Sequence, residues 1–322
     1  MCFWKNKKVL VTGGAGFIGS HVVELLVEKG ANVKIADNLK NGSLNNLLKV
    51  KNNIVVMNKD FMNLRDCIEV TKGVDIVLNL AAKVGGIDFN RQCPATMLRD
   101  NLCININMLE AARLCKVEKF LMVSSACVYP RMCKIPTPET EGFVGVPEPT
   151  NYGYGWAKRM AEIQAETYYQ EFGLNVAIAR PYNTYGPRDH FDPEKSHVIP
   201  ALIKRIFDGE NPLVVWGDGE QSRTFMFVTD TARGMIALIE KYPKPDPVNI
   251  GTDEEIKIKD LVKIILEISG IKTKVVFDVS KPSGQSRRNS DNNKAIEKIG
   301  FKAEISLREG LEKTINWYKK YR

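Results

Sequence analysis

The segment KKVLVTGGAGFIGSHVVELLVEKG near the N-terminus constrains the fold more than any other part of the chain. An apolar run ends in glycines, and apolar residues at helical spacing follow until Gly30 closes the segment. Gly13, Gly16 and Gly19 lie between the predicted strand and helix, where they permit a tight turn and the close approach of a phosphate to the helix N-terminus. The segment therefore predicts a dinucleotide-binding strand–turn–helix unit.

Strand and helix patterns alternate through the first half of the chain. Apolar runs predict further strands within 32–38, 53–60, 74–82 and 119–130, and helical spacing predicts a helix over 102–117. Such alternation indicates an α/β fold with a doubly wound parallel sheet of the Rossmann type.

The character of the sequence changes near ARPYNTYGP, at 179–187, where Pro- and Gly-rich loops begin. We predict a dinucleotide-binding domain over 1–180 and a smaller α/β substrate domain over 181–322. The segment 223–242 is expected to return to the first domain.

Charge and cysteine content exclude several functions. The net charge of +8 is dispersed and no three Lys or Arg are adjacent, which argues against nucleic acid and favours an anionic small ligand. The seven cysteines lack CxxC or zinc-like spacing, so we expect reduced thiols in a cytoplasm and no metal site. We find neither a signal peptide nor an 18-residue apolar run, and expect no membrane association.

Asp37 ends the second predicted strand, roughly 20 residues beyond the glycines. Its carboxylate is placed to accept hydrogen bonds from both hydroxyls of an adenosine ribose, and it would repel a 2′-phosphate. The cofactor is therefore predicted to be NAD rather than NADP.

Tyr154 and Lys158 in YGYGWAK lie four residues apart, on one face of a helix. The ammonium is expected to stabilise a phenolate and to lower the pKa of the tyrosine toward neutrality. Such a tyrosine removes a hydroxyl proton while hydride leaves the same carbon.

Together with NLAA at 79–82, Ser125 and RPYNTYGP at 180–187, these motifs resemble the extended short-chain dehydrogenase/reductase superfamily over nearly the whole chain. The resemblance implies a hydride-transfer triad of Ser125, Tyr154 and Lys158. It implies a cofactor site formed by Gly13, Gly16, Phe17, Ile18, Gly19, Asp37, Asn38, Asp60, Phe61, Leu80, Ala81, Ala82, Tyr154 and Lys158.

Two narrower families share motifs with the chain. The motifs AAKVGGI, EPTN and YGPRDHFDPEKSHVIPALIKR resemble GDP-L-fucose synthases, which are epimerase-reductases. The motifs SSACVYP, WGDGEQSRTF, VNIGTDE and RRNSDNN resemble GDP-mannose 3,5-epimerases. Both families act on GDP-hexoses, so the resemblance implies a GDP-sugar substrate. It also implies a homodimer formed by helices that include the one carrying Tyr154.

Both narrower families have a cysteine at the position of Cys127, where it acts as acid or base on carbons beside a C4 ketone. Its partner in the fucose-synthase pattern is the histidine of SHVIPAL, here His197. The epimerase pattern uses a lysine nearby, for which Lys195 is the local candidate. The alternative interpretations are a buried apolar thiol for Cys127 and a helix cap beside Ser196 for His197.

The same resemblance implies a substrate site formed by Gly85, Gly86, Ser125, Asn183, Arg205, Arg223 and Arg288. Guanidinium groups suit phosphate oxygens because they donate two parallel hydrogen bonds. Trp216 in VVWGDG is expected to be a core residue.

Three functions remain after this comparison. The leading hypothesis is an NAD-dependent 3,5-epimerase of a GDP-hexose or GDP-heptose, and the alternative is an NAD(P)H-consuming 4-ketoreductase. A non-catalytic nucleotide sensor is the third. A 4,6-dehydratase is disfavoured because Ser125-Ala126-Cys127 stand where Thr-Asp-Glu is expected, and a 4-epimerase needs no acid/base cysteine.

Overall fold

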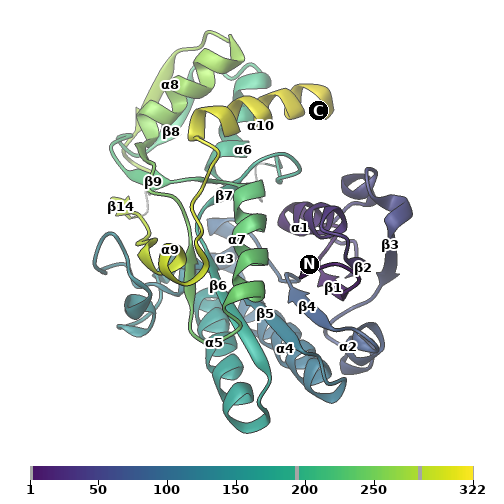
Figure 1. Cartoon of the computed structure of the whole chain (residues 1–322). Coiled ribbons are helices and arrows are strands. Elements are labelled where there is room, and N and C mark those ends of the chain that lie inside the picture. The colour runs from purple at the N-terminus through teal and green to yellow at the C-terminus, as the bar shows by residue number, and fades with distance from the viewer. Residues whose placement is uncertain (1–2, 193–195, 282–284, 322) are drawn as a thin grey trace.

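The computed structural model describes residues 3–192, 196–281 and 285–321, and shows a large sheet between helices with a small lobe above it (Figure 1). The strands of the large sheet are β1 (Lys8–Thr12), β2 (Asn32–Asp37), β3 (Ile54–Asn58), β4 (Ile76–Asn79), β5 (Lys119–Val123), β6 (Asn175–Pro181) and β11 (Val248–Ile250). The helices around it are α1 (Phe17–Glu28), α2 (Leu64–Thr71), α3 (Ile87–Gln92), α4 (Pro94–Leu114), α5 (Tyr152–Phe172), α7 (Val228–Lys241) and α9 (Asn293–Ile299).

The large sheet has seven parallel strands in the order β11-β6-β5-β4-β1-β2-β3. Chain order therefore reverses between β1 and β4. Ligands of open α/β sheets bind at the carboxyl ends of the strands at such a reversal. The predicted doubly wound, Rossmann-type fold is confirmed.

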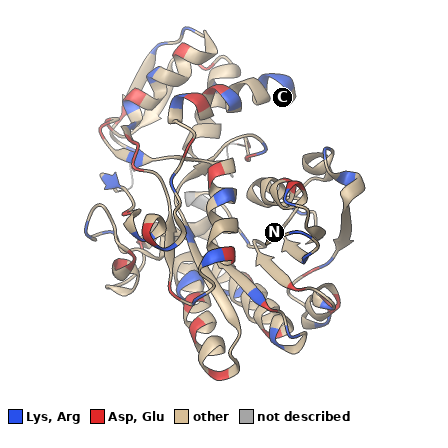
Figure 2. Cartoon of the chain, in the orientation of Figure 1, with Lys and Arg blue, Asp and Glu red and all other residues tan. Residues whose placement is uncertain are grey.

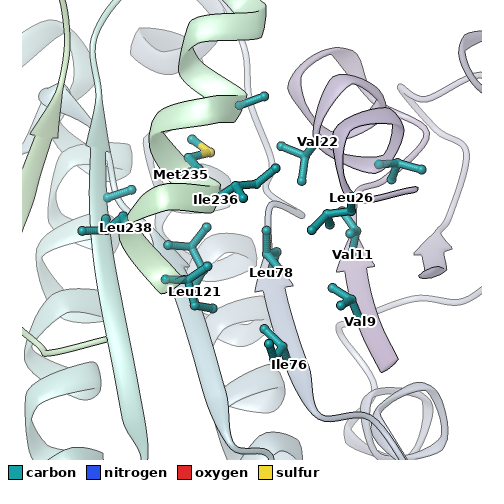
Figure 3. Packing of buried hydrophobic residues seen from close by; sticks show 14 of the residues in the cluster. Val9, Val11, Val22, Leu26, Ile76, Leu78, Leu121, Met235, Ile236 and Leu238 are labelled. Carbon is teal, nitrogen blue, oxygen red and sulfur yellow. The ribbon is translucent and has the colours of Figure 1, made fainter. Parts of the chain in front are cut away.

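Alternate side chains of the strands pack against helices on opposite faces of the sheet, as expected for parallel strands buried on both sides. Val9 and Val11 of β1 pack in a core with α1 and α7 (Figure 3). Leu10, between them, packs in a second core with α2, α4 and α5. One strand thus contributes to both layers.

The small lobe has its own apolar core. Its helices and strands are α6 (Val198–Phe207), β8 (Leu213–Trp216), α8 (Ile258–Ser269), β13 (Val275–Asp278) and α10 (Leu307–Tyr321). Two minor sheets join the lobe to the large sheet, one formed by β7 (Thr184–Tyr185) and β10 (Met226–Phe227), the other by β9 (Ser222–Thr224), β12 (Glu255–Lys257) and β14 (Arg287–Arg288).

The chain crosses between the two parts more than once. It leaves the large sheet after β6, forms α6 and β8, and returns as α7, which packs in the same core as α1, and as edge strand β11 (Figure 1). The sheet is therefore complete only with residues on both sides of position 180. The boundary at 180/181 and the return segment 223–242 stay predictions from the sequence.

Charged side chains of both signs are interspersed over both parts (Figure 2). Within the described ranges, no helix is both long enough and apolar enough to span a bilayer.

Candidate active site

A cavity of about 990 Å³ lies between the large sheet and the small lobe. Its lining includes every residue that the sequence analysis predicts for the cofactor, for the chemistry and for the substrate. We call the part formed by the ends of β1, β2 and β4 the sheet wall, and the part formed by residues 182–288 the small-lobe wall. The structure thus brings the predicted residues together, while their individual roles stay predictions.

The turn from β1 to α1 is packed so closely that only glycine fits. A Cβ on Gly19 would lie 2.1 Å from the carbonyl oxygen of Gly13, and Gly13 itself has a φ of +66°. The N-cap residue of α1 is Gly16, and α1 has no N-cap hydrogen bond from a side chain among the described residues. The first N–H groups of α1 are therefore left to a ligand, and a helix N-terminus favours a phosphate.

Polar groups behind this turn bond to one another. Thr12 Oγ1 donates to Asn79 Oδ1 at 2.7 Å and accepts from Ala81 N at 3.1 Å. Asn79 Nδ2 donates to Asn105 Oδ1 at 3.1 Å. These hydrogen bonds fix the ends of β1 and β4 relative to each other, so the sheet wall is rigid before any ligand binds.

Asp37 ends β2 on the cavity wall. Its carboxylate accepts from Ala15 N at 3.1 Å and from Leu39 N at 2.8 Å, which fixes its position beside the glycine turn. Further along, Asp60 pairs with the exposed Lys40 at 3.4 Å. The glycine turn, the N-terminus of α1 and the Asp37 carboxylate together fit a dinucleotide.

Ser125 and Cys127 follow β5 at the sheet edge. Ser125 Oγ accepts from Cys127 N at 3.1 Å and so caps the short turn over Ala126–Val128. This hydrogen bond fixes the backbone of the thiol residue relative to the hydroxyl. Cys127 is half-buried and lines the cavity.

Tyr154 and Lys158 project from the first turns of α5. Lys158 Nζ lies 5.5 Å from the centre of the Tyr154 ring and donates to Val123 O at 2.7 Å. Burial lowers the pKa of Lys158 to about 8 and raises the pKa of Tyr154, an effect that a hydrogen bond with Ser125 partly offsets. The pKa of Tyr154 is therefore raised rather than lowered as expected, because burial of the phenol is the largest influence on it.

A buried ion pair lies next to Lys158 on α5. Glu162, one turn beyond Lys158 on α5, forms a two-point ion pair with Arg180 at 2.6 and 2.8 Å, and both side chains are at most 2% exposed. Glu162 also accepts from Ser124 Oγ. The pair therefore joins α5, β5 and β6 at the site where the predicted triad lies.

His197 precedes α6 at its N-cap position and lines the cavity. It makes no capping hydrogen bond within the described residues, so the helix-cap interpretation is not supported. Burial within the cavity, together with the nearby His190, lowers the pKa of the imidazole. A neutral imidazole is able to accept a proton at neutral pH. Lys195, the alternative partner, lies outside the described residues.

Arg223 and Arg288 are directly paired across the parallel strands β9 and β14. Neither forms an ion pair within the described part of the chain. Arg223 donates to Ser222 O and to Gln285 O, and burial with the charge of Arg288 lowers its pKa to about 10. Two adjacent cations without a carboxylate partner are suited to an anion such as a diphosphate.

The other predicted substrate residues are held by the protein itself. Arg205 donates to Glu210 at 2.5 and 2.6 Å and to Val214 O, so its charge is largely neutralised. Asn183 Nδ2 donates to Thr224 O at 2.9 Å. Gly85 and Gly86 lie in a loop whose carbonyls accept from the buried Asn90, at 2.8 and 2.9 Å.

Several lining residues were missed by the sequence analysis. Trp216 is not a core residue, since 46% of it is exposed and it lines the cavity where β8 ends. Asp189 and Gln221 also line the cavity, and each keeps a buried oxygen without a hydrogen-bond partner among the described residues. The only signal for Asp189 in the sequence is its place in YGPRDH, directly after a predicted site motif.

No group of three His, Cys, Asp or Glu side chains among the described residues is placed to hold a metal ion. The cavity lining offers hydroxyls, the Lys158 ammonium, the Cys127 thiol and the imidazoles of His190 and His197.

Comparisons with known proteins agree with this geometry. The sequence profile of the NAD dependent epimerase/dehydratase family matches residues 9–251. A probable GDP-L-fucose synthase 1 of Oryza sativa is 35% identical, over 98% of this chain and 92% of its own length. A GDP-mannose 3,5-epimerase of Arabidopsis thaliana is 32% identical, over 98% and 84%. The crystal structure of a UDP-glucose 4-epimerase of Thermotoga maritima with UDP-glucose superposes with a TM-score of 0.88 at 32% identity, covering 97% of this chain and 98% of that one.

Proposed function

The chain belongs to the NAD dependent epimerase/dehydratase family, whose nucleotide-sugar epimerases and reductases depend on NAD(P), and we propose that it is a 3,5-epimerase of a GDP-hexose or GDP-heptose. The proposal rests on one observation. Cys127 and His197 line the same cavity as Ser125, Tyr154 and Lys158, so two acid/base groups accompany a triad for hydride transfer.

The triad would handle the C4 hydroxyl of the sugar. Tyr154 removes the hydroxyl proton, Ser125 donates a hydrogen bond to the same oxygen, and Lys158 stabilises the phenolate with its positive charge. A bound NAD would supply a reversible hydride acceptor for C4.

The thiol and the imidazole would then act on the carbons beside the ketone. A C4 ketone acidifies the protons on C3 and C5, because the resulting carbanion is delocalised as an enolate. One group removes the proton from one face, and the other returns a proton to the opposite face. Cys127 follows β5 whereas His197 precedes α6 of the small lobe, so the two groups approach the sugar from different elements.

We further propose that the cofactor is NAD and that it is retained through turnover. The support is Asp37, whose buried carboxylate lines the cavity at the end of β2 and would repel a 2′-phosphate. The paired Arg223 and Arg288 are proposed to bind the diphosphate of the GDP-sugar.

A homodimer in the cytoplasm is also part of the proposal. Helices α4 and α5 expose large apolar side chains, which supports pairing with a second copy, namely Ile106, Leu114, Ile163, Tyr169 and Phe172. The six described cysteines are free thiols, which supports a reducing compartment.

A 4-ketoreductase is the second candidate, because the fucose-synthase relative is the more similar of the two at 35% against 32% identity. It differs from the epimerase in consuming NAD(P)H with each turnover. Loss of nicotinamide absorbance on adding a 4-keto GDP-sugar would support it, whereas the epimerase leaves that absorbance unchanged.

The test uses GDP-mannose in deuterated water with no added cofactor. We expect NAD to be released from the denatured protein and deuterium to appear at C3 or C5 of the sugar. Cys127→Ser should reduce the exchange about 100-fold or more. The matched control is Cys133→Ser, a half-buried thiol beside Thr137 that does not line the cavity. Exchange at the normal rate in Cys127→Ser would exclude the proposed role.

A further inference from the structure

The segment 186–192, which we call the strap, joins β7 to the loop before α6. At its start it is bonded to α1, the helix that follows the glycine turn. Pro187 O accepts from His21 Nε2 at 3.1 Å, and Arg188 forms an ion pair with Glu24 at 2.6 Å. Arg188 has a φ of +71°, which is rare for a residue with a side chain. These contacts hold the strap against α1.

The far end of the strap is held by the small lobe. The ring of Phe191 stacks on Tyr318 and on Trp317 of α10, with ring centres 4.6 and 5.8 Å apart. The strap is therefore fixed at both ends, and the residues between its anchors are held in a defined place beside the cavity.

Asp189 lies between these anchors and lines the cavity. It is 7% exposed, and Oδ1 accepts from His190 N at 2.7 Å. Its other oxygen, Oδ2, has no hydrogen-bond partner among the described residues. Burial raises the pKa of this carboxyl to about 7. The environment thus disfavours the charged form when the cavity holds only protein.

A buried carboxylate oxygen without a partner is costly, so the missing hydrogen bond calls for a donor such as a bound ligand. A ligand that donates to Oδ2 favours the ionised carboxylate, which only accepts, so we take the partner to be a donor. The cavity is proposed to hold three sources of such donors, namely the ribose hydroxyls of a dinucleotide, the ribose hydroxyls of GDP and the hydroxyls of a hexose.

We propose that Asp189 is a ligand-binding residue whose Oδ2 accepts a hydrogen bond from a sugar hydroxyl in the cavity. The strap fixes this acceptor oxygen between α1 and α6. This inference rests on the proposed function only in that the cavity takes a dinucleotide and a nucleotide sugar.

The experiment compares Asp189→Asn and Asp189→Ala with the unchanged protein freed of nucleotide. The matched control is Asp75→Asn, a half-buried carboxylate that accepts a backbone N–H from Lys8 at 2.8 Å and lies outside the cavity. Binding of NAD is measured alone by calorimetry, and GDP-mannose and GDP are each titrated with NAD saturating. These readouts do not depend on turnover.

Loss of a hydrogen bond to a carboxylate is expected to weaken binding about 10- to 100-fold in Asp189→Ala, with a smaller effect in Asp189→Asn. Weaker NAD binding would assign the hydroxyl to a ribose of the dinucleotide. Weaker GDP-mannose binding with unchanged GDP binding would assign it to the hexose.

Unchanged affinity for both ligands in both variants, with unfolding midpoints equal to that of the control, would overturn the proposal. If Asp189→Ala unfolds, Asp189→Asn retains an acceptor for His190 N and decides the result. A parent protein that binds NAD and GDP but not GDP-mannose would contradict the proposed function instead, and the NAD titration alone would then decide the role of Asp189.

Discussion

The sheet wall and the small-lobe wall of the cavity satisfy their polar groups in different ways. On the sheet wall, Thr12, Asn79 and Asp37 bond to one another or to nearby backbone N–H groups. On the small-lobe wall, Asp189 and Gln221 keep oxygens without partners among the described residues, and the cations Arg223 and Arg288 lie side by side. These side chains of the first wall bond within the protein, whereas these groups of the second wall are suited to bind a ligand.

This difference has an energetic consequence. Substitutions in the sheet wall remove contacts that the fold itself needs, so stability and cofactor affinity should fall together. Substitution of Asp189 or Arg223 in the small-lobe wall removes a group suited to a ligand, so ligand affinity should fall more than stability.

The largest effect is expected at Tyr154, which lines the cavity from α5, outside both walls. Tyr154→Phe removes the proton acceptor while the ring and its packing remain, so we expect kcat to fall about 1000-fold. Binding of NAD and of GDP-mannose should change less than threefold. Tyr152→Phe, on the exposed start of α5, is the control. Retained turnover in Tyr154→Phe would remove the tyrosine from the chemistry.

Gly19→Ala tests the sheet wall directly. The new Cβ would meet backbone atoms of Gly13 and Gly14 at 3.0 Å or less, and these atoms have no room to move away. We expect a loss of about 3 kcal/mol in unfolding free energy, and at least tenfold weaker NAD binding. Urea unfolding and NAD calorimetry measure the two effects.

The control is Gly73→Ala, where φ is also positive, at +68°, but no atom lies within 4 Å of the new Cβ. It should cost only about 1 kcal/mol and leave NAD binding unchanged. If Gly19→Ala kept full stability while losing the cofactor, the sheet wall would not be coupled to the fold.

Arg223→Gln tests the small-lobe wall. Loss of one of two adjacent cations should raise the KM for a GDP-sugar about 30-fold, and the effect should shrink at high salt. Unfolding free energy should fall by no more than about 1 kcal/mol, because the loss of the hydrogen bonds to Ser222 O and Gln285 O is offset by removal of a buried cation that has no carboxylate partner in the described residues. Arg287→Gln, an exposed neighbour paired with Glu255, should leave KM unchanged. A large stability loss in Arg223→Gln would contradict the comparison.

The smallest predicted effect is a pH dependence of stability. The pKa of Lys158 is lowered by burial to about 8 in the folded protein, against 10.5 in the unfolded chain. Between these values the unfolded chain binds more protons, so this group makes stability rise with pH. The rise is roughly 1 kcal/mol between pH 8 and pH 9. Lys158→Met should lack this rise in urea unfolding across that range, and an equal slope in both proteins would contradict the lowered pKa.

The sheet wall was predictable from the sequence because its parts are local. The glycine turn follows directly from a strand, and Asp37 ends the next one, so spacing alone places both at the cavity. Ser125 and Cys127 are likewise placed by the end of β5. The doubly wound parallel fold followed from the same alternation of strand and helix, although the last two strands of the sheet, β6 and β11, were not predicted.

The small-lobe wall was harder because its parts meet only through tertiary contacts. Arg223 and Arg288 become neighbours through the register of two short strands far apart in the sequence. Trp216 was expected in the core, but β8 ends at this residue, which is 46% exposed and lines the cavity. Asp189 was missed because its importance comes from a buried oxygen without a partner among the described residues, and the sequence does not show that this loop residue is buried.

The late return of α7 and β11 to the large sheet has a consequence for biosynthesis. A nascent chain that has emerged as far as β6 already holds six of the seven strands, yet the apolar face that α7 covers is still open to water. That face closes only after residues up to Ile250 have left the ribosome. Domains fold as their chain emerges, so this apolar surface stays exposed while the residues between β6 and β11 are translated. We expect chaperones that shield apolar surface to bind the nascent chain at this stage.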